Sequence, residues 1–448
     1  MAEPARSSSS SSLKRKLPEG QAEASQPAQK ATKIHPFFLK KTVDEEQKPK
    51  GSFQWLEPLG PAKSCLHGIN LQPKASEKVA ALDLDGTVIT MTKMKPGIPA
   101  FAWWRSLVPD KLRELHRDGY SIVLISNQAL QSNALKTWKE KVPQVGNAVS
   151  LSAHPHPLLH DVPFRILAAT QRDRYRKPMP GMWYELERIF SEEGVQIDKS
   201  KSFFVGDAAG RLYTQSKGDF ASTDRKWALN LDIPFFTPEE FFLKLAPHTK
   251  YELPGFHPSS LPHLPLVTPS SSPIIPERQQ KEVVVFVGYP SLGKTTFFRK
   301  YFEPYGYVHI NQDTLKTREK CVKAVEEALK AGKSCVVDNT NPSLQVRSLY
   351  VDVAKANKAP ARCFLFTGSL ELAWHNNLYR AYNLPPTVAA KEAERTVLPF
   401  AALTKFRDAY APPAAAEGFS EIKNVNWVFE GSEEEKKRWS MWLQIDGK

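Results

Sequence analysis

Residues 283–296 read Val283-Val-Val-Phe-Val287-Gly288-Tyr-Pro-Ser-Leu-Gly293-Lys294-Thr295-Thr296. The apolar run predicts a buried strand, and the G-x4-G-K-T pattern after it predicts a phosphate-binding loop that opens a helix. Glycines let backbone N–H groups surround a triphosphate at a helix N-terminus, where the helix dipole also favours anions. We therefore expect ATP to bind at Gly288, Gly293, Lys294, Thr295 and Thr296, with Lys294 on the β- and γ-phosphates and Thr295 on Mg2+.

Downstream strand ends carry the groups that a phosphate acceptor needs. Strands are predicted at 309–310, 334–337 and 362–366, and a helix is predicted over 316–331, ending at Gly332. Asp313 follows the first of these strands and is the candidate base for an acceptor hydroxyl. Asp338 and Asn339 follow the second and would support the acceptor or metal-bound water, although an Asn-rich turn that caps a helix is the alternative. Arg380 is expected on a mobile helical lid over the transferring phosphate, with a plain surface arginine as the alternative.

The N-terminal half delivers a second reactive sequence at a strand end. A strand predicted over 79–84 runs into Asp83-Leu84-Asp85-Gly86-Thr87, at the edge where open α/β sheets bind ligands. Gly86 lets the chain turn at once, so both carboxylates can converge on one substrate. Asp83 can attack phosphorus to give an aspartyl-phosphate, and Asp85 can protonate the leaving oxygen.

Three later segments add groups suited to a phosphoryl substrate. Ser126 and Asn127 follow a predicted strand at 121–126 and offer a hydroxyl and backbone donors to phosphate oxygens. Lys177 offers a point charge for the same oxygens. Asp207 follows a strand predicted over 202–205 and is placed to hold Mg2+. Asp224 is a further candidate for that metal site, the alternative being an exposed loop acid.

The order of acid pair, Ser/Asn, Lys and Gly-Asp resembles the haloacid dehalogenase superfamily of phosphohydrolases. This resemblance implies Asp83 as nucleophile, Asp85 as general acid and then base, and Ser126 and Lys177 on phosphate. It places Mg2+ on Asp207, and we also assign Asp83 and Asp85 to the metal site.

Composition divides the 448 residues into four parts. Residues 1–62 are rich in Ser, Pro, Lys, Glu and Gln and predict a disordered basic tail. Residues 63–250 and 282–448 alternate apolar runs with amphipathic segments and predict two α/β domains, each a mainly parallel sheet covered by helices. Residues 251–281 contain recurring prolines and predict an extended linker.

Charge and cysteine content restrict the class of protein. The formal net charge of +13 favours a polyanionic partner such as nucleic acid. The lack of a long apolar run and of an N-terminal apolar segment argues against a membrane protein and a secreted one. Four scattered cysteines indicate reduced thiols rather than a disulfide or zinc framework.

A phosphatase followed by a kinase on one chain resembles the eukaryotic polynucleotide kinase 3′-phosphatases, which process DNA ends. Longer strings carry this resemblance, among them residues 175–183, 202–211, 228–230, 237–242, 311–314, 338–342 and 375–377. It implies a monomer that removes 3′-phosphates and phosphorylates 5′-hydroxyls at DNA breaks, with Asp313 as the base for the 5′-hydroxyl. An RNA-end healing enzyme, a metabolite phosphatase fused to a kinase, and a non-catalytic scaffold are the alternatives. The intact Asp83 and Lys294 argue against the scaffold.

The chain departs from the animal members of that family. The tail is too short for their forkhead-associated domain, so we expect a form closer to the fungal or plant enzymes. Gln312, Trp374 and Leu378 stand where animal members usually carry Arg, which predicts a less basic lid.

The tail suggests a location and a partner. Lys14-Arg15-Lys16 predicts nuclear import, with mitochondrion and cytoplasm left open. Ile34, Phe37 and Phe38 have the spacing of a PCNA-interaction box, in which Ala31 stands where the first residue is usually Gln.

We interpret the histidines at 154, 156 and 160 as a surface turn and the tryptophans at 103 and 104 as packing residues. Residues 426–429 and 433–442 predict a strand and a closing helix packed through Trp439 and Trp442.

Overall fold

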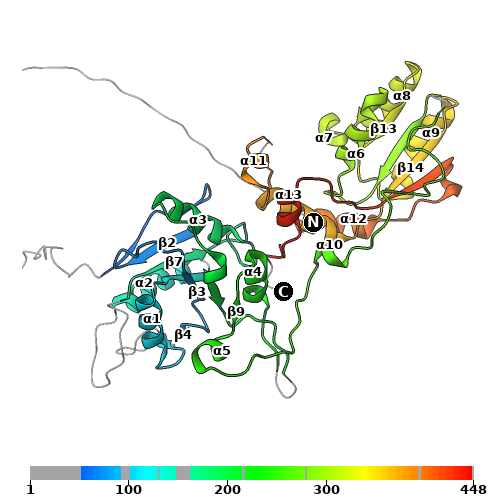
Figure 1. The fold of residues 1–448 in the computed structure, drawn as a ribbon. Coiled ribbons are helices and arrows are strands. Elements are labelled where there is room, and N and C mark those ends of the chain that lie inside the picture. The colour runs from blue at the N-terminus through cyan, green and yellow to red at the C-terminus, as the bar shows by residue number, and fades with distance from the viewer. Residues whose placement is uncertain are drawn as a thin grey trace, which may run out of the picture. The chain divides into compact units, whose positions relative to one another are not determined.

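A computed structural model describes residues 52–91, 101–128, 130, 132–147, 162–213, 217–277, 280–391 and 395–445. Two helix-covered sheets, one in each half of the chain, dominate this part of the protein (Figure 1). The predicted import signal at Lys14–Lys16, the predicted PCNA-interaction box with Ile34, Phe37 and Phe38, and the predicted surface turn at residues 154–160 lie outside the described residues.

The first sheet has seven strands in the order β1-β2-β7-β6-β3-β8-β9. The pairs β7–β6, β6–β3, β3–β8 and β8–β9 are parallel, and β1 and β2 add an antiparallel edge. The strands of this sheet are β1 (Phe53–Trp55), β2 (Cys65–Asn70), β3 (Val79–Asp83), β6 (Ser121–Asn127), β7 (Phe164–Ala169), β8 (Phe203–Val205) and β9 (Phe235–Phe236). A separate hairpin pairs β4 (Ile89–Met91) with β5 (Phe101–Trp103).

Alternating apolar side chains of β3, such as Leu82 and Ala81, enter two different cores. One core packs the sheet against α1 (Val108–Arg117), α2 (Ser132–Asn147) and α5 (Pro238–Leu243). The other packs it against α3 (Gly181–Glu192) and α4 (Thr223–Leu231). Because both faces are covered, the central strands are apolar throughout, as expected of buried parallel strands.

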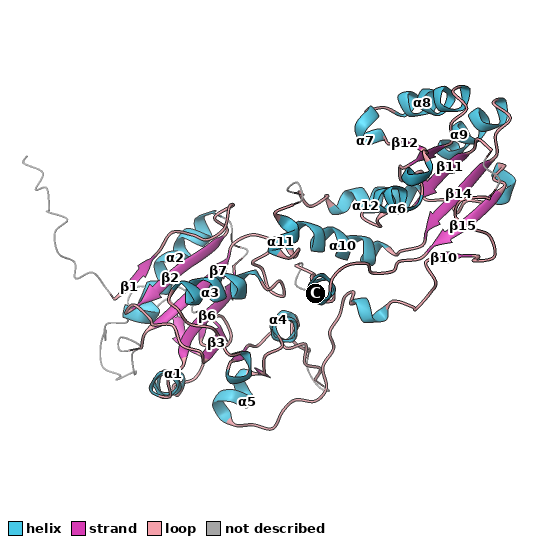
Figure 2. Ribbon diagram, turned by 45° about the horizontal axis from the view of Figure 1, so that its top comes forward, coloured by secondary structure: helices cyan, strands magenta, loops and turns pink. Residues whose placement is uncertain are grey.

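The second sheet has six strands in the order β10-β15-β14-β11-β13-β12, all parallel except the β10–β15 pair. The strands of this sheet are β10 (Val267–Thr268), β11 (Val283–Val287), β12 (Val308–Ile310), β13 (Cys335–Val337), β14 (Ala361–Phe366) and β15 (Glu421–Val425). One face packs against α6 (Lys294–Tyr301), α10 (Leu370–Tyr382), α12 (Phe400–Ala409) and α13 (Glu433–Trp439). The other packs against α8 (Arg318–Lys330) and α9 (Leu344–Ala356). The short helix α7 (Gln312–Leu315) lies next to α8, and the short helix α11 (Pro386–Ala389) follows α10 (Figure 2).

Two segments differ from the boundaries predicted from composition. The predicted tail was assigned up to residue 62, but Phe53–Trp55 pairs with β2 and packs Phe53 into the first core. The predicted linker contributes β10 to the second sheet, and the buried Lys423 donates to the Pro269 carbonyl at 3.1 Å and to the Ser272 carbonyl at 2.7 Å. The prolines of this stretch indicated a linker rather than a strand. A two-residue strand at the edge of a sheet needs few backbone donors, so neighbouring prolines are compatible with it.

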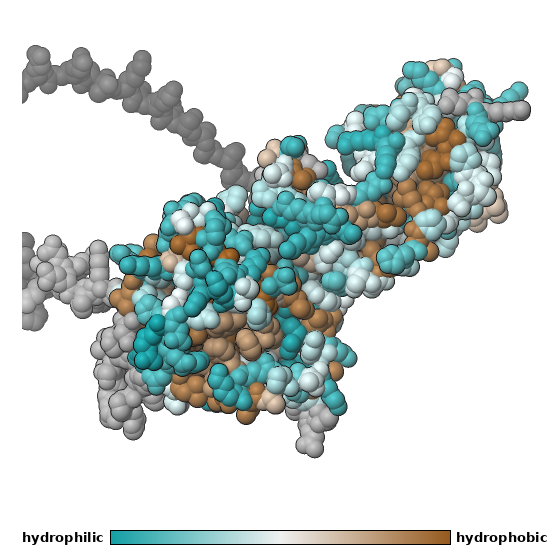
Figure 3. All heavy atoms as spheres, in the orientation of Figure 1, coloured by the Kyte–Doolittle hydropathy of each residue, from teal (hydrophilic) through white to brown (hydrophobic). Residues whose placement is uncertain are grey.

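No helix among the described residues is long and apolar enough to cross a membrane. The face in Figure 3 carries hydrophilic side chains interspersed with smaller hydrophobic patches. The four cysteines are buried free thiols, as predicted. Trp103 and Trp104 pack against the first core, which confirms their interpretation as packing residues.

Candidate active sites

A buried ion-pair system forms at the carboxyl edge of the first sheet. The Lys177 Nζ lies 2.6 Å from Oδ1 of Asp83 at the end of β3 and 2.8 Å from Oδ1 of Asp224 in the first turn of α4. The same ammonium donates to the Ile125 carbonyl at 3.1 Å. All three side chains are at least 90% buried. Asp224 therefore belongs to the site, and its alternative reading as an exposed loop acid is wrong because α4 packs it inward.

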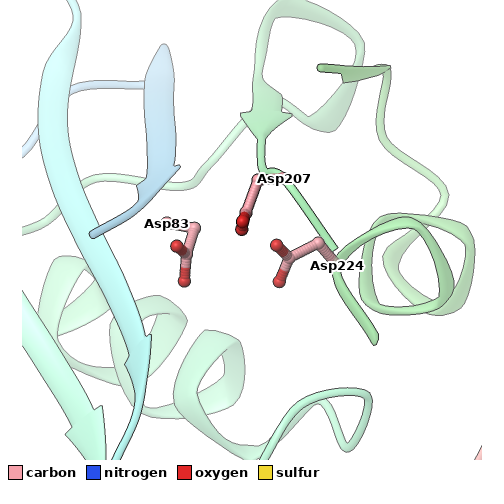
Figure 4. A group of neighbouring side chains, drawn as sticks. All are labelled: Asp83, Asp207 and Asp224. Carbon is pink, nitrogen blue, oxygen red and sulfur yellow. The ribbon is translucent and has the colours of Figure 1, made fainter. Parts of the chain in front are cut away.

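Asp83, Asp207 and Asp224 form an acidic cluster in which one carboxylate oxygen of each lies within 4.8 Å of the others. Their carboxylates point toward one another from the ends of β3 and β8 and from α4 (Figure 4). Two glycines make this approach feasible. A Cβ on Gly86 would meet Oδ2 of Asp207 at 2.4 Å, and a Cβ on Gly206 would meet Oδ2 of Asp224 at 2.4 Å.

The charges of the cluster suit a divalent cation. Three carboxylates face the single ammonium of Lys177, which leaves an excess of negative charge in a buried site. Burial and the neighbouring Asp224 raise the pKa of Asp207 to about 7, and burial raises the pKa of Asp83 well above its usual range. Burial alone would lower the pKa of Lys177, but Asp224 and Asp83 outweigh it and raise that pKa. A bound Mg2+ would offset the excess, and carboxylate oxygens are its preferred ligands.

The structure does not bring the Asp85 side chain into the acidic cluster, and its assignment to the metal site stays a prediction. The Gln128 amide donates to Oδ2 of Asp85 at 2.6 Å. Oδ1 of Asp85 is buried without a partner among the described residues. Burial raises the pKa of Asp85, and the bond from Gln128 opposes the shift. A carboxyl group with a raised pKa suits the predicted role of proton donor.

Ser126 and Asn127 have different roles in the structure. Ser126 is buried beside Asp85, and its Oγ accepts from Nε2 of Gln128 at 2.9 Å. The Asn127 side chain accepts from the Lys177 N–H at 2.9 Å and donates to the Lys177 carbonyl at 3.1 Å. Its amide therefore fixes the backbone that carries the active-site lysine. The predicted contact of Asn127 with phosphate stays a prediction.

The phosphate-binding loop lies between β11 and α6, as its sequence predicts. Gly288, Ser291 and Gly293 have positive φ values of 152°, 64° and 80°, as a tightly turned loop requires. Lys294 is buried, and its Nζ donates to the carbonyls of Gly288 at 3.1 Å and Tyr289 at 2.5 Å. Burial lowers the pKa of Lys294 to about 8, so an incoming polyphosphate would favour its charged form. Thr296 is exposed in the first turn of α6.

Asp338 joins this loop to the neighbouring strand. Its Oδ2 accepts from Oγ1 of Thr295 at 2.6 Å and lies 2.9 Å from Nε2 of His309, which stacks on Phe298 with ring centroids 4.3 Å apart. Asp338 is 2% exposed, so its bonds hold the Thr295 hydroxyl at the predicted metal position. Asp338 does not cap the following helix, whose N-cap is Ser343, and its acceptor-side role stays a prediction.

Asp313 is exposed on α7, where a substrate can reach it. Oδ1 of Asn311 accepts from the Asp313 N–H at 2.7 Å, and Oδ1 of Asn339 accepts from the Gln312 N–H at 2.8 Å. Asn339 therefore supports the short helix that presents Asp313.

The helix with Arg380 differs from the predicted mobile lid. Leu372, Leu378 and Tyr379 of α10 belong to the second domain's core, and His375, Asn376 and Asn377 are also buried. The helix is therefore a fixed support, and Arg380 lies half-buried in its last turn. Trp374 and Leu378, predicted as losses of lid charge, pack against this core. Nδ2 of Asn376 donates to the Ser291 carbonyl of the phosphate loop at 3.2 Å.

Gln128 and His309 make side-chain contacts in these sites that were not predicted. Gln128 follows Ser126 and Asn127 at the same strand end, but its side chain was given no role. His309 belongs to a strand, and its contact with Asp338 depends on strand pairing that sequence spacing does not reveal.

The predicted final strand at 426–429 is wrong, because β15 covers Glu421–Val425 and the next residues are a loop. Helix α13 ends at Trp439, which is buried in the second core. Trp442 lies beyond the helix and contacts residues of the first domain, including Lys226, whose Nζ is 4.7 Å from its ring centroid.

Known proteins resemble both halves of the chain. Family models described as polynucleotide kinase 3 phosphatase and AAA domain match residues 78–242 and 283–413. A bifunctional polynucleotide phosphatase/kinase of Schizosaccharomyces pombe is 35% identical over 83% of this chain and 84% of its own length. A putative bifunctional polynucleotide phosphatase/kinase of Acanthamoeba polyphaga mimivirus is 33% identical over 86% of this chain and 93% of its own length.

Polynucleotide 3′-phosphatase ZDP of Arabidopsis thaliana is 34% identical over 38% of this chain and 24% of its own length. That match concerns one domain, whereas the first two relatives span both. A haloacid-dehalogenase-like phosphatase domain thus precedes a P-loop kinase domain, as the strand-end residues predicted. The chain belongs to the family of bifunctional polynucleotide phosphatase/kinases.

Proposed function

We propose that this enzyme restores broken DNA ends by removing 3′-phosphates and phosphorylating 5′-hydroxyls with ATP, as a step of strand-break repair. The observation that carries the proposal is the buried Asp83–Lys177–Asp224 system on the same chain as a complete phosphate loop. The net charge of +13 supports a polyanionic substrate. The names of the two-domain relatives support polynucleotide ends over a small metabolite.

In the phosphatase site, a carboxylate oxygen of Asp83 attacks phosphorus as the bond to the 3′-oxygen breaks. Asp85 gives its proton to that leaving oxygen, which becomes the 3′-hydroxyl. Water then attacks the aspartyl-phosphate, Asp85 takes the water's proton, and inorganic phosphate leaves as the Asp83 carboxylate reforms. The raised pKa of Asp85 favours the protonated form that the first step requires.

Lys177 and the backbone around Ser126 bind the phosphoryl oxygens during these steps. Asp83, Asp207 and Asp224 fit Mg2+ because three carboxylates converge with only one ammonium among them. The ion, when bound, supplies positive charge that stabilises the phosphoryl oxygens in the transition state.

In the kinase site, Asp313 takes the proton of the 5′-hydroxyl, whose oxygen attacks the γ-phosphorus of ATP. The bond to the β,γ-bridging oxygen breaks and ADP leaves. Lys294 binds the phosphates, and Thr295, held by Asp338, is the side chain that would hold Mg2+. Arg380 is the proposed further contact to ATP.

We also propose a nuclear location and a contact with PCNA. Lys14-Arg15-Lys16 and the apolar side chains of Ile34, Phe37 and Phe38 support these two proposals. Alanine at the three apolar positions should weaken PCNA capture on beads without changing either activity on free oligonucleotides. Unchanged capture would contradict the proposed contact.

The decisive experiment uses a nicked duplex with a 3′-phosphate and a 5′-hydroxyl, incubated with Mg2+ with and without labelled ATP. We expect phosphate release in both cases and 5′-labelling only with ATP. Asp83→Asn should lose phosphate release and keep 5′-labelling, and Lys294→Ala should do the reverse. An RNA-ended duplex serves as the comparison substrate. Faster turnover of RNA ends would overturn the DNA assignment, and hydrolysis of small phosphate esters alone would overturn the polynucleotide assignment.

A further inference from the structure

The last described residues of the chain, Trp442–Ile445, link the kinase domain to the loop that carries Lys177. We refer to these four residues as the bridge segment. Leu443 and Ile445 are buried in the kinase core, so the segment is anchored in that domain. Its backbone and its first side chain contact the phosphatase domain instead. The segment therefore belongs to both domains.

Asn230 of α4 makes the central contact between them. Its Oδ1 accepts from the Trp442 N–H at 2.7 Å, and its Nδ2 donates to the Trp442 carbonyl at 2.8 Å. The same Nδ2 donates to the Pro178 carbonyl at 2.8 Å. Asn230 is 7% exposed, so these bonds form away from bulk water and strongly fix its orientation. One buried amide thus ties the bridge segment to the residue directly after Lys177.

The residues on either side of Lys177 and Pro178 also contact the kinase domain. Nε of Arg176 donates to the Ile445 carbonyl at 3.1 Å. Met179 is fully buried, and its side chain packs within the kinase core together with Met441 and Leu443. Arg176 and Met179 are therefore held from the kinase side, Pro178 is held by Asn230, and Lys177 points into the phosphatase site.

We propose that Asn230 and Arg176 are positioning residues of the phosphatase, and that the bridge segment sets the place of the Lys177 ammonium. The Asn127 amide fixes the Lys177 backbone, and Asn230, which is itself oriented by the Trp442 backbone, fixes the adjoining Pro178 carbonyl. Because a displacement of about 1 Å in a catalytic group can cost about a hundredfold in rate, this second support affects catalysis. The phosphatase site therefore depends on the C-terminal end of the kinase domain.

The test compares Asn230→Ala with Asn70→Ala in the full-length protein. Asn70 is a matched control: it is buried, and its side chain also binds backbone, donating to the Val162 carbonyl at 2.9 Å. It lies at the far end of β2, opposite the edge that carries Asp83. On a 3′-phosphate oligonucleotide we expect Asn230→Ala to lower kcat about tenfold to a hundredfold, with KM changed less than about twofold. Asn70→Ala should leave both constants near their original values, even with a similar loss of melting temperature.

Arg176→Gln and Asn230→Asp provide a second line of evidence if Asn230→Ala fails to fold. Asn230→Asp keeps the acceptor for the Trp442 N–H but loses both donors, and Arg176→Gln loses the guanidinium that binds the Ile445 carbonyl. Each should lower phosphatase kcat and leave 5′-kinase activity within about twofold, and Arg176→Lys should recover part of the loss. Equal loss of activity in Asn230→Ala and Asn70→Ala, or loss of both activities together, would overturn the positioning role.

The inference rests on the proposed phosphatase function, and the design separates the two. The original protein is measured first, and its failure to release 3′-phosphate would reject the function itself. Normal release that is insensitive to Asn230 and Arg176 would reject only the positioning role.

Discussion

The Lys177 ammonium lies 2.6 Å from the Asp83 carboxylate in a site from which water is almost excluded. One of these groups is the proposed nucleophile and the other the proposed phosphate ligand, so the resting site pairs the two groups that a substrate phosphate must separate. A bound phosphate would give Lys177 a new partner, and Mg2+ would give Asp83 one.

Removing the charge of Lys177 should destabilise the phosphatase domain. Lys177→Met leaves Asp83 and Asp224 buried without their cation, and breaking such a pair costs about 3–5 kcal/mol. We expect a corresponding fall in the free energy of unfolding, partly reversed by Mg2+, because the ion replaces the lost charge. Denaturant unfolding with and without Mg2+ measures both effects. A variant as stable as the original protein would contradict this view of the site.

Gly86 should be essential to the acidic cluster for a steric reason. In Gly86→Ala the new Cβ would meet Oδ2 of Asp207 at 2.4 Å, so the carboxylate must move. We expect a loss of phosphatase activity of at least about tenfold and a weaker rise of melting temperature with added Mg2+. Gly119→Ala is the control, since Gly119 has a similar φ of 83° but no atom within 4 Å of the new Cβ. Equal effects of the two substitutions would show that backbone strain, rather than Asp207, causes the loss.

Asp338→Asn should impair the kinase and spare the phosphatase. The substitution removes the charge that accepts from Thr295 and faces His309, and changes of this kind commonly cost about 10- to 100-fold in activity. Steady-state labelling of a 5′-hydroxyl oligonucleotide measures the effect, and Asp352→Asn, an exposed acid on α9, is the control. A kinase unaffected by Asp338→Asn would mean that Thr295 needs no support from that carboxylate.

His375 should make the kinase domain less stable in acid. Burial lowers its pKa to about 4, from about 6.5 in an unfolded chain. Between these values the unfolded chain binds more protons, so stability falls as the pH drops from about 6.5 toward 4. His375→Gln should flatten this dependence in unfolding experiments at pH 7, 6 and 5. An equally steep dependence in the variant would assign the acid sensitivity to other groups.

The sequence was sufficient to predict the site residues whose positions follow from the order of strands, loops and helices along the chain. Parallel strands present their carboxyl ends at one edge, so Asp83, Ser126 and Asp207 could be grouped from strand ends alone. Lys294 and Thr295 could be placed in the same way, because the loop joins one strand to one helix.

Contacts between distant segments could not be predicted in this way. The inward position of Asp224 depends on how α4 packs, and the fixed position of α10 depends on the core beneath it. The strands at Phe53–Trp55 and Val267–Thr268 are too short to show a period-2 pattern, and only their pairing identifies them. Asn230 carries no motif, and its role depends on a bond to a residue 212 positions away.

Substitution of Trp439 should impair the kinase site and leave the phosphatase site unaffected. Its Nε1 donates to Oδ1 of Asn376 at 2.8 Å, and Nδ2 of Asn376 donates to the Ser291 carbonyl in the phosphate loop. Trp439→Phe keeps an aromatic ring but loses this donor, so Asn376 is less firmly oriented. Because a buried hydrogen bond is worth about 1 kcal/mol, we expect KM for ATP to rise about fivefold while phosphatase kcat stays unchanged.

Trp427→Phe is the matched control for that substitution. Trp427 stacks on Trp439 with ring centroids 5.9 Å apart, and its Nε1 is buried without a hydrogen-bond partner among the described residues. The control therefore removes the same atoms from the same aromatic cluster but no hydrogen bond. A rise in KM for ATP in both variants would attribute the effect to packing of the indole rings. A rise in Trp439→Phe alone, set beside a phosphatase defect in Asn230→Ala alone, would show that one C-terminal region supports the two active sites through separate contacts.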